Sequence, residues 1–275
     1  MPLPNFIIVG AAKAGTTSLY AYLKQHPQVF MSAIKEPRYF AVKNKHLDWH
    51  DATVQKVWRN TVSNFADYQA LFAEAEGFAA VGEASPIYLW EPDAAQNIVE
   101  AIPEVKIIAI LRNPVDRAFS HFGHFHAVSI DTSPDFEAAL AKDEQAQNFQ
   151  YVALGNYYPQ LLRYYQTFAA QQIKVFLFED LVKNPQQLLT ELYQFIGVST
   201  EYMPDFSKKY NTFSSKHQAK GWKKYLPQWL KNEFYPPKPK PTMNPQTRKK
   251  LLEVYAQPNR LLSELIDKDL SAWKN

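Results

Sequence analysis

The chain of 275 residues carries 30 Lys and Arg residues against 27 Asp and Glu residues, and its formal charge of +3 predicts no strong affinity for a polyanion such as a nucleic acid. It has no cysteine, which excludes a disulfide framework and a Cys-ligated metal and suits a reducing compartment. No apolar run approaches the ~20 residues that span a bilayer, and the first residues lack the pattern of a signal peptide, so we expect a cytoplasmic protein without a membrane span.

The chain opens with a pattern that predicts a phosphate-binding loop. A short apolar run, Phe6–Val9, predicts a buried strand that ends at Gly10, and a helix is predicted from Thr17 to Gln25. In a strand–loop–helix turn the backbone N–H groups and the helix dipole face a bound anion. Lys13 adds a positive charge to this loop. Three hydroxyl groups follow it, those of Thr16, Thr17 and Ser18. We therefore predict a site for an anionic nucleotide.

This motif differs from the P-loop of NTPases, G-x-x-x-x-G-K-[ST]. Gly10 and Gly15 keep the spacing of the two glycines, and Thr17 falls on the Ser/Thr position. Thr16 stands where the P-loop has Lys, and the Lys of this chain lies three residues earlier, at position 13. A tight turn with a solvated Lys is the structural alternative, and the three hydroxyl residues argue against it. A P-loop kinase or NTPase is the functional alternative.

Predicted strands alternate with predicted helices between residues 5 and 197. After the first strand, the predicted strands are Val29–Met31, Ala79–Ala84, Lys106–Leu111 and Lys174–Phe178. The second of these is followed by the turn Ser85-Pro86, and the last ends at Glu179-Asp180. The later predicted helices are Phe65–Glu76, Pro92–Ala101, Val115–Phe125, Asp135–Asp143, Tyr157–Ala170, Pro185–Ile196 closed by Gly197, and Asn244–Lys268. The alternation predicts a single α/β domain over residues 1–275, with a central, mainly parallel β-sheet flanked by helices.

Ligands of parallel sheets bind at the carboxyl ends of the strands. Gly10, Ala84-Ser85 and Arg112 all lie at such ends, so this edge of the sheet can bring them together. Two stretches lack periodicity. We expect residues 41–64 to be a loop or lid. Residues 199–243 are rich in Lys, aromatic residues and Pro, and a mobile loop over the site, at 205–243, is favoured there over a linker.

Several motifs occur in the order found in one known family. They are Val9–Leu19, Lys35–Phe40, Leu111–His121 and a tail from Leu251–Tyr255 through Pro258-Asn259 to Ala272-Trp273, supported by Phe178–Leu181 and Asn184-Pro185. On these motifs the chain resembles sulfotransferases that use 3'-phosphoadenylyl sulfate (PAPS), of the branch that includes heparan-sulfate sulfotransferases and bacterial relatives. The resemblance implies transfer of a sulfuryl group from PAPS to a hydroxyl group, or less favourably an amine, of a carbohydrate or small-molecule acceptor, with release of the bisphosphate PAP.

The resemblance also implies how the phosphosulfate is bound. Lys13 would contact the 5'-phosphosulfate and neutralise the charge that grows on the bridging oxygen as the sulfuryl group leaves. The same group would be held by the rest of the P-loop-like loop and the start of the helix, through Ala14, Gly15, Thr16, Thr17 and Ser18.

The second anionic group of PAPS, the 3'-phosphate, needs a site of its own. Arg112 and Ser120 resemble the ligands of this phosphate, and the guanidinium fork of Arg can donate two hydrogen bonds to it. The alternative for Arg112 is an ion pair with a carboxylate. Arg117 is expected to be a surface or ion-pairing residue. One lysine of the later loop is expected to close over PAPS, namely Lys220, or in its place Lys238 or Lys240.

The acceptor hydroxyl needs a base. Glu36 resembles the Glu that serves as base in the heparan-sulfate branch; the neighbouring Lys35 and Arg38 would lower its pKa, whereas burial would raise it. A structural ion pair is the alternative role of Glu36. Other branches use a His base, and five are available here: His46, His50, His121, His124 and His126. For the last three, packing or solvent is favoured over a metal. We expect no metal requirement, because sulfate carries less charge than phosphate.

The sequence leaves the acceptor open. Ala84 stands where the family often has a Lys that binds an anionic glycan, which disfavours a heparan-type acceptor. Six aromatic residues could stack on sugars or line an apolar pocket: Trp49, Trp58, Tyr88, Trp90, Tyr157 and Tyr158. A polysaccharide, a small phenol or alcohol, and a carrier-bound hydroxyacyl chain stay open as acceptors. A non-catalytic nucleotide-binding or glycan-binding module is the alternative to an enzyme.

Overall fold

A parallel β-sheet forms the centre of the molecule. The computed structural model describes residues 2–43, 45, 58–146, 149–207 and 242–274. The strands are β1 (Phe6–Gly10), β2 (Val29–Met31), β3 (Ala80–Ala84), β4 (Lys106–Leu111) and β5 (Ile173–Leu177). They lie in the order β2-β3-β1-β4-β5, and every pairing between these described strands is parallel. The predicted α/β fold with a parallel sheet is therefore confirmed.

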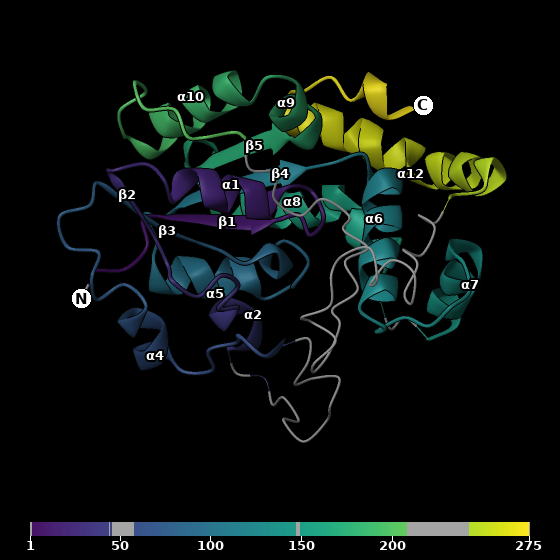
Figure 1. Cartoon of the computed structure of the whole chain (residues 1–275), viewed down its shortest axis with the longest axis horizontal. Helices are drawn as coiled ribbons and strands as arrows, with labels where there is room; N and C mark the ends of the chain where they lie inside the picture. The colour runs from purple at the N-terminus through teal and green to yellow at the C-terminus, as the bar shows by residue number, and fades with distance from the viewer. Residues whose placement is uncertain (1, 44, 46–57, 147–148, 208–241, 275) are drawn as a thin grey trace, which may run out of the picture.

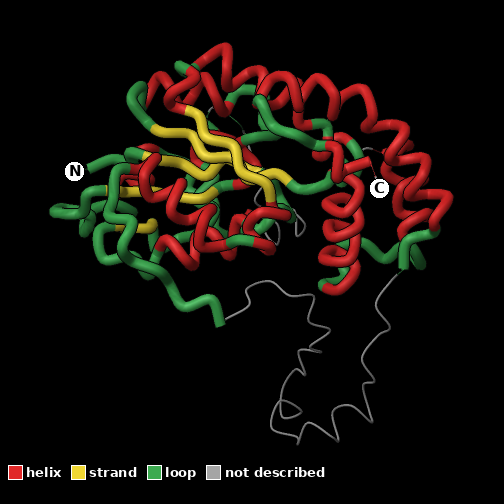
Figure 2. Tube along the Cα trace, turned by 90° about the horizontal axis from the view of Figure 1, so that it is seen from above, coloured by secondary structure: helices red, strands yellow, loops and turns green. Residues whose placement is uncertain are grey.

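Helices cover both faces of this sheet (Figure 1, Figure 2). One face is covered by α1 (Thr16–Leu23), α9 (Phe178–Lys183) and α10 (Pro185–Ile196), and the other by α5 (Ala94–Ala101), α8 (Tyr157–Thr167) and α12 (Pro245–Ile266). Strands that are buried on both faces are apolar without alternation. In β4, Ile108 and Ile110 pack in the apolar core on the side of α1, α9 and α10, whereas Ile107 and Leu111 pack in the core on the side of α5, α8 and α12.

Two further helices lie beyond the carboxyl ends of the strands, α6 (Pro114–Ala127) and α7 (Phe136–Ala146) (Figure 1). A third apolar core joins them to α12, through Phe122, Phe136 and Tyr255 among others. α6 follows β4 almost directly, because the Asn113 side chain caps it by accepting a hydrogen bond from the Val115 N–H at 3.0 Å. The shorter elements are α2 (Tyr39–Val42), α4 (Phe65–Ala70), η1 (Pro86–Tyr88), η2 (Ala153–Gly155), η3 (Ala170–Gln172) and η5 (Ser271–Lys274).

Most predicted elements are present, and β2, β4 and α10 have the predicted bounds. Two ends are wrong. The helix predicted at Phe65–Glu76 ends at Ala70. The chain then continues to Ala75 in tighter turns, in which the N–H groups of Leu71, Phe72, Ala73 and Ala75 donate to the third residue before each. The last strand ends at Leu177, because the acidic pair Glu179-Asp180 lies in the first turn of α9, where the helix dipole favours negative charge.

Some predictions fall on residues outside the described part. Residues 208–241 make up most of the loop predicted at 205–243, and residues 44 and 46–57 belong to the loop predicted at 41–64. The extent of the domain, 1–275, stays a prediction. Among the described helices, none is long and apolar enough to cross a membrane.

Candidate active site

The β1–α1 loop has the form of an anion cradle at the carboxyl edge of the sheet. Gly10 is required, because a Cβ there would lie 2.5 Å from Leu89 Cβ. Gly15 has a φ of 95°, and a Cβ there would lie 2.8 Å from the Phe178 ring. α1 begins at Thr16, so its first N–H groups have no partner within the helix. The other predicted ligands lie in the same loop and first turn: Ala14, Thr17 and Ser18.

Lys13 is a half-buried cation in this loop, with a left-handed backbone at φ 70°. No ion pair of the described residues includes it. Burial, followed by the charge of Arg112, lowers the pKa of Lys13 to about 8; Lys35 and Arg117 act in the same direction, and Glu36 opposes them. A bound anion would offset this repulsion and raise the pKa again.

Arg112 lies beside the Lys13 loop, although the two residues are 99 positions apart. Its Nη1 donates to the Lys13 carbonyl at 3.4 Å, and its guanidinium lies 4.8 Å from the centroid of the Phe178 ring. The Tyr157 hydroxyl donates to the Arg112 carbonyl at 3.0 Å. No carboxylate in the described part of the chain pairs with Arg112, so nothing there supports the alternative of a strand-end ion pair. Ser120 lies half-buried on α6, which begins just after Arg112.

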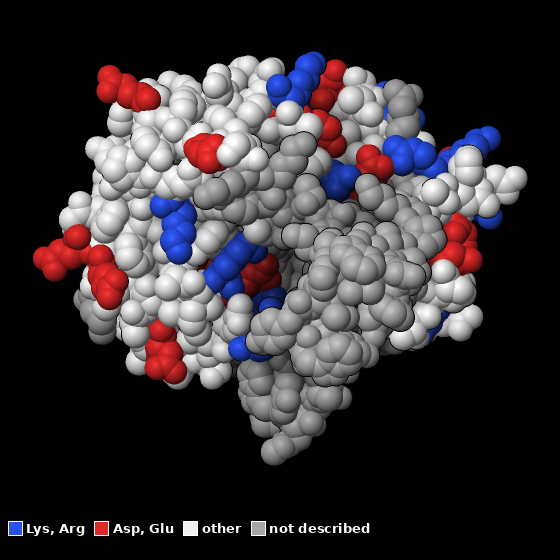
Figure 3. All heavy atoms as spheres, viewed as in Figure 1, with Lys and Arg blue, Asp and Glu red and all other residues white. Residues whose placement is uncertain are grey.

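Glu36 lies at the carboxyl end of β3, where its N–H donates to the Ala84 carbonyl at 3.0 Å. Glu36 and Arg38 have positive φ angles of 63° and 57°, and strained non-glycine backbone of this kind gathers at functional sites. The Glu36 carboxylate pairs with Lys35 at 2.6 Å and with Arg38 at 2.5 Å. Burial raises the pKa of Glu36, but the two cations outweigh burial and lower it to about 2. The carboxylate is therefore ionised at neutral pH. Figure 3 shows basic side chains around a recessed acidic one near the middle of this face.

A chain of hydrogen bonds joins this turn to a carboxylate inside the sheet. The Arg38 N–H donates to Ser85 Oγ at 3.1 Å, and the Ser85 hydroxyl donates to Glu83 at 2.7 Å. The Tyr68 hydroxyl also donates to Glu83, at 3.3 Å. Glu83 is fully buried, and burial raises its pKa to about 7. Ser85 was expected at this edge of the sheet, whereas Glu83 was not singled out, although a carboxylate near the end of an apolar strand was the signal for it.

Two His residues of α6 lie near the same charges. His121 is buried, and burial holds its pKa well below its usual value. His124 reaches solvent, yet partial burial of the ring and the charge of Lys13 lower its pKa to about 4, while Glu36 opposes them. Both imidazoles are neutral at pH 7, and His124 is the accessible one. Two other candidate bases, His46 and His50, lie outside the described residues, and His126 is half-buried near the end of α6.

The comparisons with known proteins bear on this arrangement of charges. Residues 3–210 match the family model described as sulfotransferase domain. The chain belongs to the sulfotransferase domain family. A crystal structure of a sulfotransferase from Alicyclobacillus acidocaldarius has 34% sequence identity and a TM-score of 0.82, with 100% of both chains covered.

Curated sulfotransferases are similar over nearly the whole of this chain. Mouse carbohydrate sulfotransferase 15 is 25% identical over 329 residues, which cover 99% of this chain and 55% of the relative. Human bifunctional heparan sulfate N-deacetylase/N-sulfotransferase 3 is 26% identical over 297 residues, which cover 98% of this chain and 31% of the relative. The chain thus spans about half the length, or less, of these curated relatives.

One basic residue of this sulfotransferase domain lies where the sequence did not predict it. Arg117, expected at the surface or in an ion pair, is fully buried, and no ion pair of the described residues includes it. The reason is its position on α6, whose inward face also carries Val115, Ala118 and His121. Its Nη2 donates to the Tyr151 carbonyl. The three lysines predicted to close over the nucleotide lie outside the described residues: Lys220, Lys238 and Lys240.

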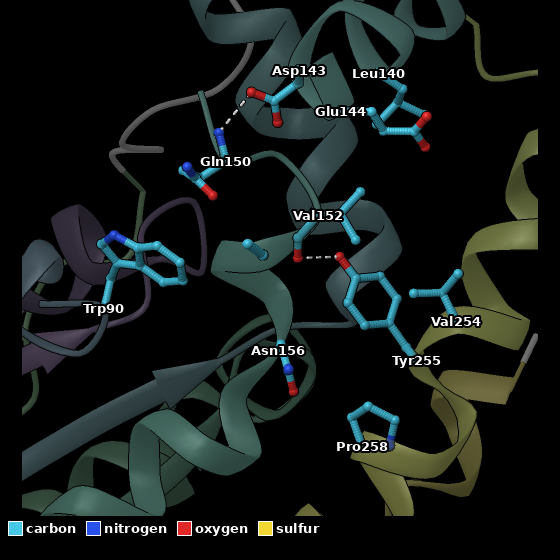
Figure 4. A pocket seen from close by; sticks show the side chains of 11 residues that line it. Trp90, Leu140, Asp143, Glu144, Gln150, Val152, Asn156, Val254, Tyr255 and Pro258 are labelled. Carbon is cyan, nitrogen blue, oxygen red and sulfur yellow. Dashed lines mark hydrogen bonds between the residues drawn. The ribbon is translucent and has the colours of Figure 1, made fainter. Parts of the chain in front are cut away.

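A cavity of about 550 Å³ lies between α7, η2, the start of α8 and α12 (Figure 4). Trp90 forms one side of it, and Asn156 and Tyr255 lie on others. Arg163 holds the segment of Trp90, because its Nη2 donates to the carbonyls of Leu89 and Trp90 at 3.1 and 3.0 Å. The cavity therefore combines an aromatic ring on an anchored backbone segment with amide, hydroxyl and carboxylate groups.

The aromatic residues predicted to contact the acceptor lie in different parts of the structure. Trp90 lines the cavity, and Trp58 lies against Arg38 with its ring centroid 5.3 Å from the guanidinium carbon. Tyr88 and Tyr157 are buried in the core instead, because their rings pack between the sheet and its helices. Tyr158 packs half-buried against the same core, and Trp49 lies outside the described residues.

Proposed function

We propose that this chain is a sulfotransferase that moves a sulfuryl group from PAPS to a hydroxyl group of a carbohydrate or small-molecule acceptor and releases PAP. One observation carries the proposal. Two cations, Lys13 and Arg112, lie side by side at the carboxyl edge of the sheet, and neither has an acidic partner among the described residues. Such a pair suits a donor with two anionic groups.

The two ends of the donor would then have separate ligands. The Lys13 ammonium and the N–H and hydroxyl groups from Ala14 to Ser18 would hold the 5'-phosphosulfate. Arg112 and Ser120 would hold the 3'-phosphate, and stacking on Phe178 keeps the Arg112 fork in place for it. A lysine of the later loop, Lys220 or in its place Lys238 or Lys240, would close over the nucleotide.

Transfer itself would be an in-line displacement. The acceptor oxygen forms a bond to sulfur while the bond from sulfur to the bridging oxygen breaks, and Lys13 neutralises the charge left on that oxygen. Glu36 would take the hydroxyl proton. Its pKa of about 2 makes it a weak base while both cations pair with it, so an acceptor must draw Lys35 or Arg38 away for efficient proton transfer. His124, neutral at pH 7, is the second candidate base.

For the acceptor we propose a chemical class and no single compound. The relatives named carbohydrate and heparan sulfate sulfotransferases support a carbohydrate. Among the described residues, the cavity beside Trp90 shares no lining residue with the site around Lys13 and Glu36, so it carries no argument about the acceptor. A small phenol or alcohol and a carrier-bound chain are the other acceptors to test. A cytoplasmic location, the absence of a nucleic-acid partner and activity without a metal stay predictions.

The experiment measures PAP release from PAPS with a panel of acceptors. Lys13→Ala and Arg112→Ala should each abolish transfer without changing the melting temperature by more than a few degrees. Lys174→Ala, on β5, and Arg260→Ala, on α12, are matched controls on exposed cations and should keep full activity. Full activity in both site variants would overturn the site assignment.

Titration calorimetry separates the alternatives. Binding of PAP without Mg²⁺ supports the sulfotransferase, whereas binding of Mg-ATP and not PAP would support a P-loop kinase or NTPase, which the comparisons do not favour. Binding of PAP with no product from any acceptor would support the non-catalytic module.

A further inference from the structure

Arg117 is a buried cation without a counter-charge at hydrogen-bond distance. Its side chain is fully buried at the fourth residue of α6. Nη2 donates to the Tyr151 carbonyl, whereas Nε and Nη1 have no hydrogen-bond partner among the described residues. A buried charge that is neither paired nor fully hydrogen-bonded is costly and rare in native proteins. This position therefore requires an explanation beyond packing.

The acidic side chain whose charge acts on Arg117, that of Asp143, is engaged elsewhere. The Asp143 carboxylate accepts backbone N–H bonds from Phe149, Gln150 and Tyr151 at 2.7, 2.9 and 2.6 Å. It makes no ion pair with Arg117, so it offsets that charge only from a distance.

The neighbouring phenols do not neutralise the guanidinium either. Tyr157 and Tyr255 pack near it, and burial raises the pKa of both, so both hydroxyl groups are uncharged at neutral pH. The described residues thus leave the positive charge of Arg117 largely uncompensated.

The geometry of α6 brings this charge to the nucleotide site. Arg117 and Ser120 are three residues apart on one helix, so their Cβ atoms lie about 5–6 Å from each other. Arg112 immediately precedes the cap of the same helix, and its carbonyl accepts a hydrogen bond from Tyr157, which is a neighbour of Arg117. Arg117 also contributes to the lowered pKa of Lys13, as expected of a nearby cation.

We propose that Arg117 is a third cation of the nucleotide site, whose buried charge is offset when the 3'-phosphate binds to Arg112 and Ser120. The inference rests on the function proposed above. Because Arg117 has no exposed surface, it acts on the phosphate through its field and is a positioning residue. The uncompensated charge of the free protein is then a source of selectivity for a nucleotide with a 3'-phosphate over one without it.

The test compares the dissociation constants of PAP and of AMP, which lacks the 3'-phosphate, by titration calorimetry at one pH and one salt concentration. Arg117→Gln removes the charge but keeps a donor for the Tyr151 carbonyl, and Arg117→Met is a second variant in case the first does not fold. Arg163→Gln is the matched control, since Arg163 is half-buried, has an Nε without a partner among the described residues and donates to backbone carbonyls as Arg117 does. Thermal unfolding verifies that each variant is folded.

We expect a folded Arg117 variant to weaken PAP binding by at least about tenfold and AMP binding by less than about threefold. Arg163→Gln should leave both nucleotide affinities within about twofold. An unchanged PAP affinity in a folded Arg117 variant, or an equal loss for PAP and AMP, overturns the inference while the proposed function stands. A wild-type protein that does not bind PAP overturns both.

Discussion

Binding of the nucleotide should be coupled to uptake of a proton by Lys13. The pKa of Lys13 in the free protein is about 8, because burial and then the charge of Arg112 disfavour its charged form. At that pKa, about a tenth of the side chain is neutral at pH 7, about half at pH 8 and about nine-tenths at pH 9. The bound phosphosulfate or phosphate offsets the neighbouring cations and returns the pKa toward its usual range. Each binding event therefore takes up from the solution a number of protons equal to the neutral fraction of Lys13.

The magnitude follows from this linkage. Since only the charged form binds well, the affinity for PAP should fall about tenfold between pH 7 and pH 9, which corresponds to about 1.4 kcal/mol. The affinity for PAP falls with rising pH, because Lys13 loses its charge as the pH rises through about 8. The phosphate groups of PAP, with second pKa values of about 6, are largely ionised over this range and contribute little to the change.

Calorimetry in two buffers with different ionisation enthalpies measures the proton count directly. Proton uptake should rise from about 0.1 at pH 7 to about 0.9 at pH 9. Lys13→Arg is the matched control, since a guanidinium stays charged throughout and should bind PAP with little dependence on pH. Equal proton uptake by the wild type at pH 7 and pH 9, or an unchanged pH dependence in Lys13→Arg, would refute the reasoning.

Three further predictions follow from single residues. Glu36→Gln should lower turnover by at least about 100-fold and change the calorimetric affinity for PAP by less than about threefold; normal turnover would move the base to a His. Gly15→Ala should lower the free energy of unfolding in urea by more than Gly77→Ala does, because both have positive φ, at 95° and 87°, but only the first Cβ meets a side chain, that of Phe178 at 2.8 Å; equal losses would show that the contact relaxes. Glu83 keeps its proton in the folded state up to pH about 7, whereas the unfolded chain loses it near pH 4.5. The free energy of unfolding of the wild type relative to Glu83→Gln should therefore fall by about 3 kcal/mol from pH 4.5 to pH 8, as measured by urea titrations at several pH values. No such fall would show that the carboxylate is solvated.

The strands and the cradle loop could be predicted because their signals are local. β4 appears in the sequence as a continuous apolar run with the bounds that the structure has. The two glycines of the loop are required by close approach and by backbone conformation, which a sequence records as an absent side chain. The end of the helix at Ala70 was less predictable, since helical and tighter turns accept the same residues.

The charged residues of the site could be named from the sequence, but the direction of their pKa shifts could not be predicted from it. Burial and the neighbouring cations act in opposite directions on the pKa of Glu36, and only the distances to Lys35 and Arg38 decide that the cations prevail. The bond from the Arg38 N–H through Ser85 to Glu83 was not predicted, because it joins residues 47 positions apart.

The sequence by itself determined the parallel α/β sheet, the loop around Lys13 and the sulfotransferase family, because periodicity, glycine positions and motif order are properties of short segments. Only the tertiary structure decided which charges lack partners. Arg112 comes to the Lys13 carbonyl from 99 positions away, and Arg117 is buried on α6 without an ion pair among the described residues. Electrostatic interactions depend on distance and on burial, and both are set by packing between segments that are remote in the sequence.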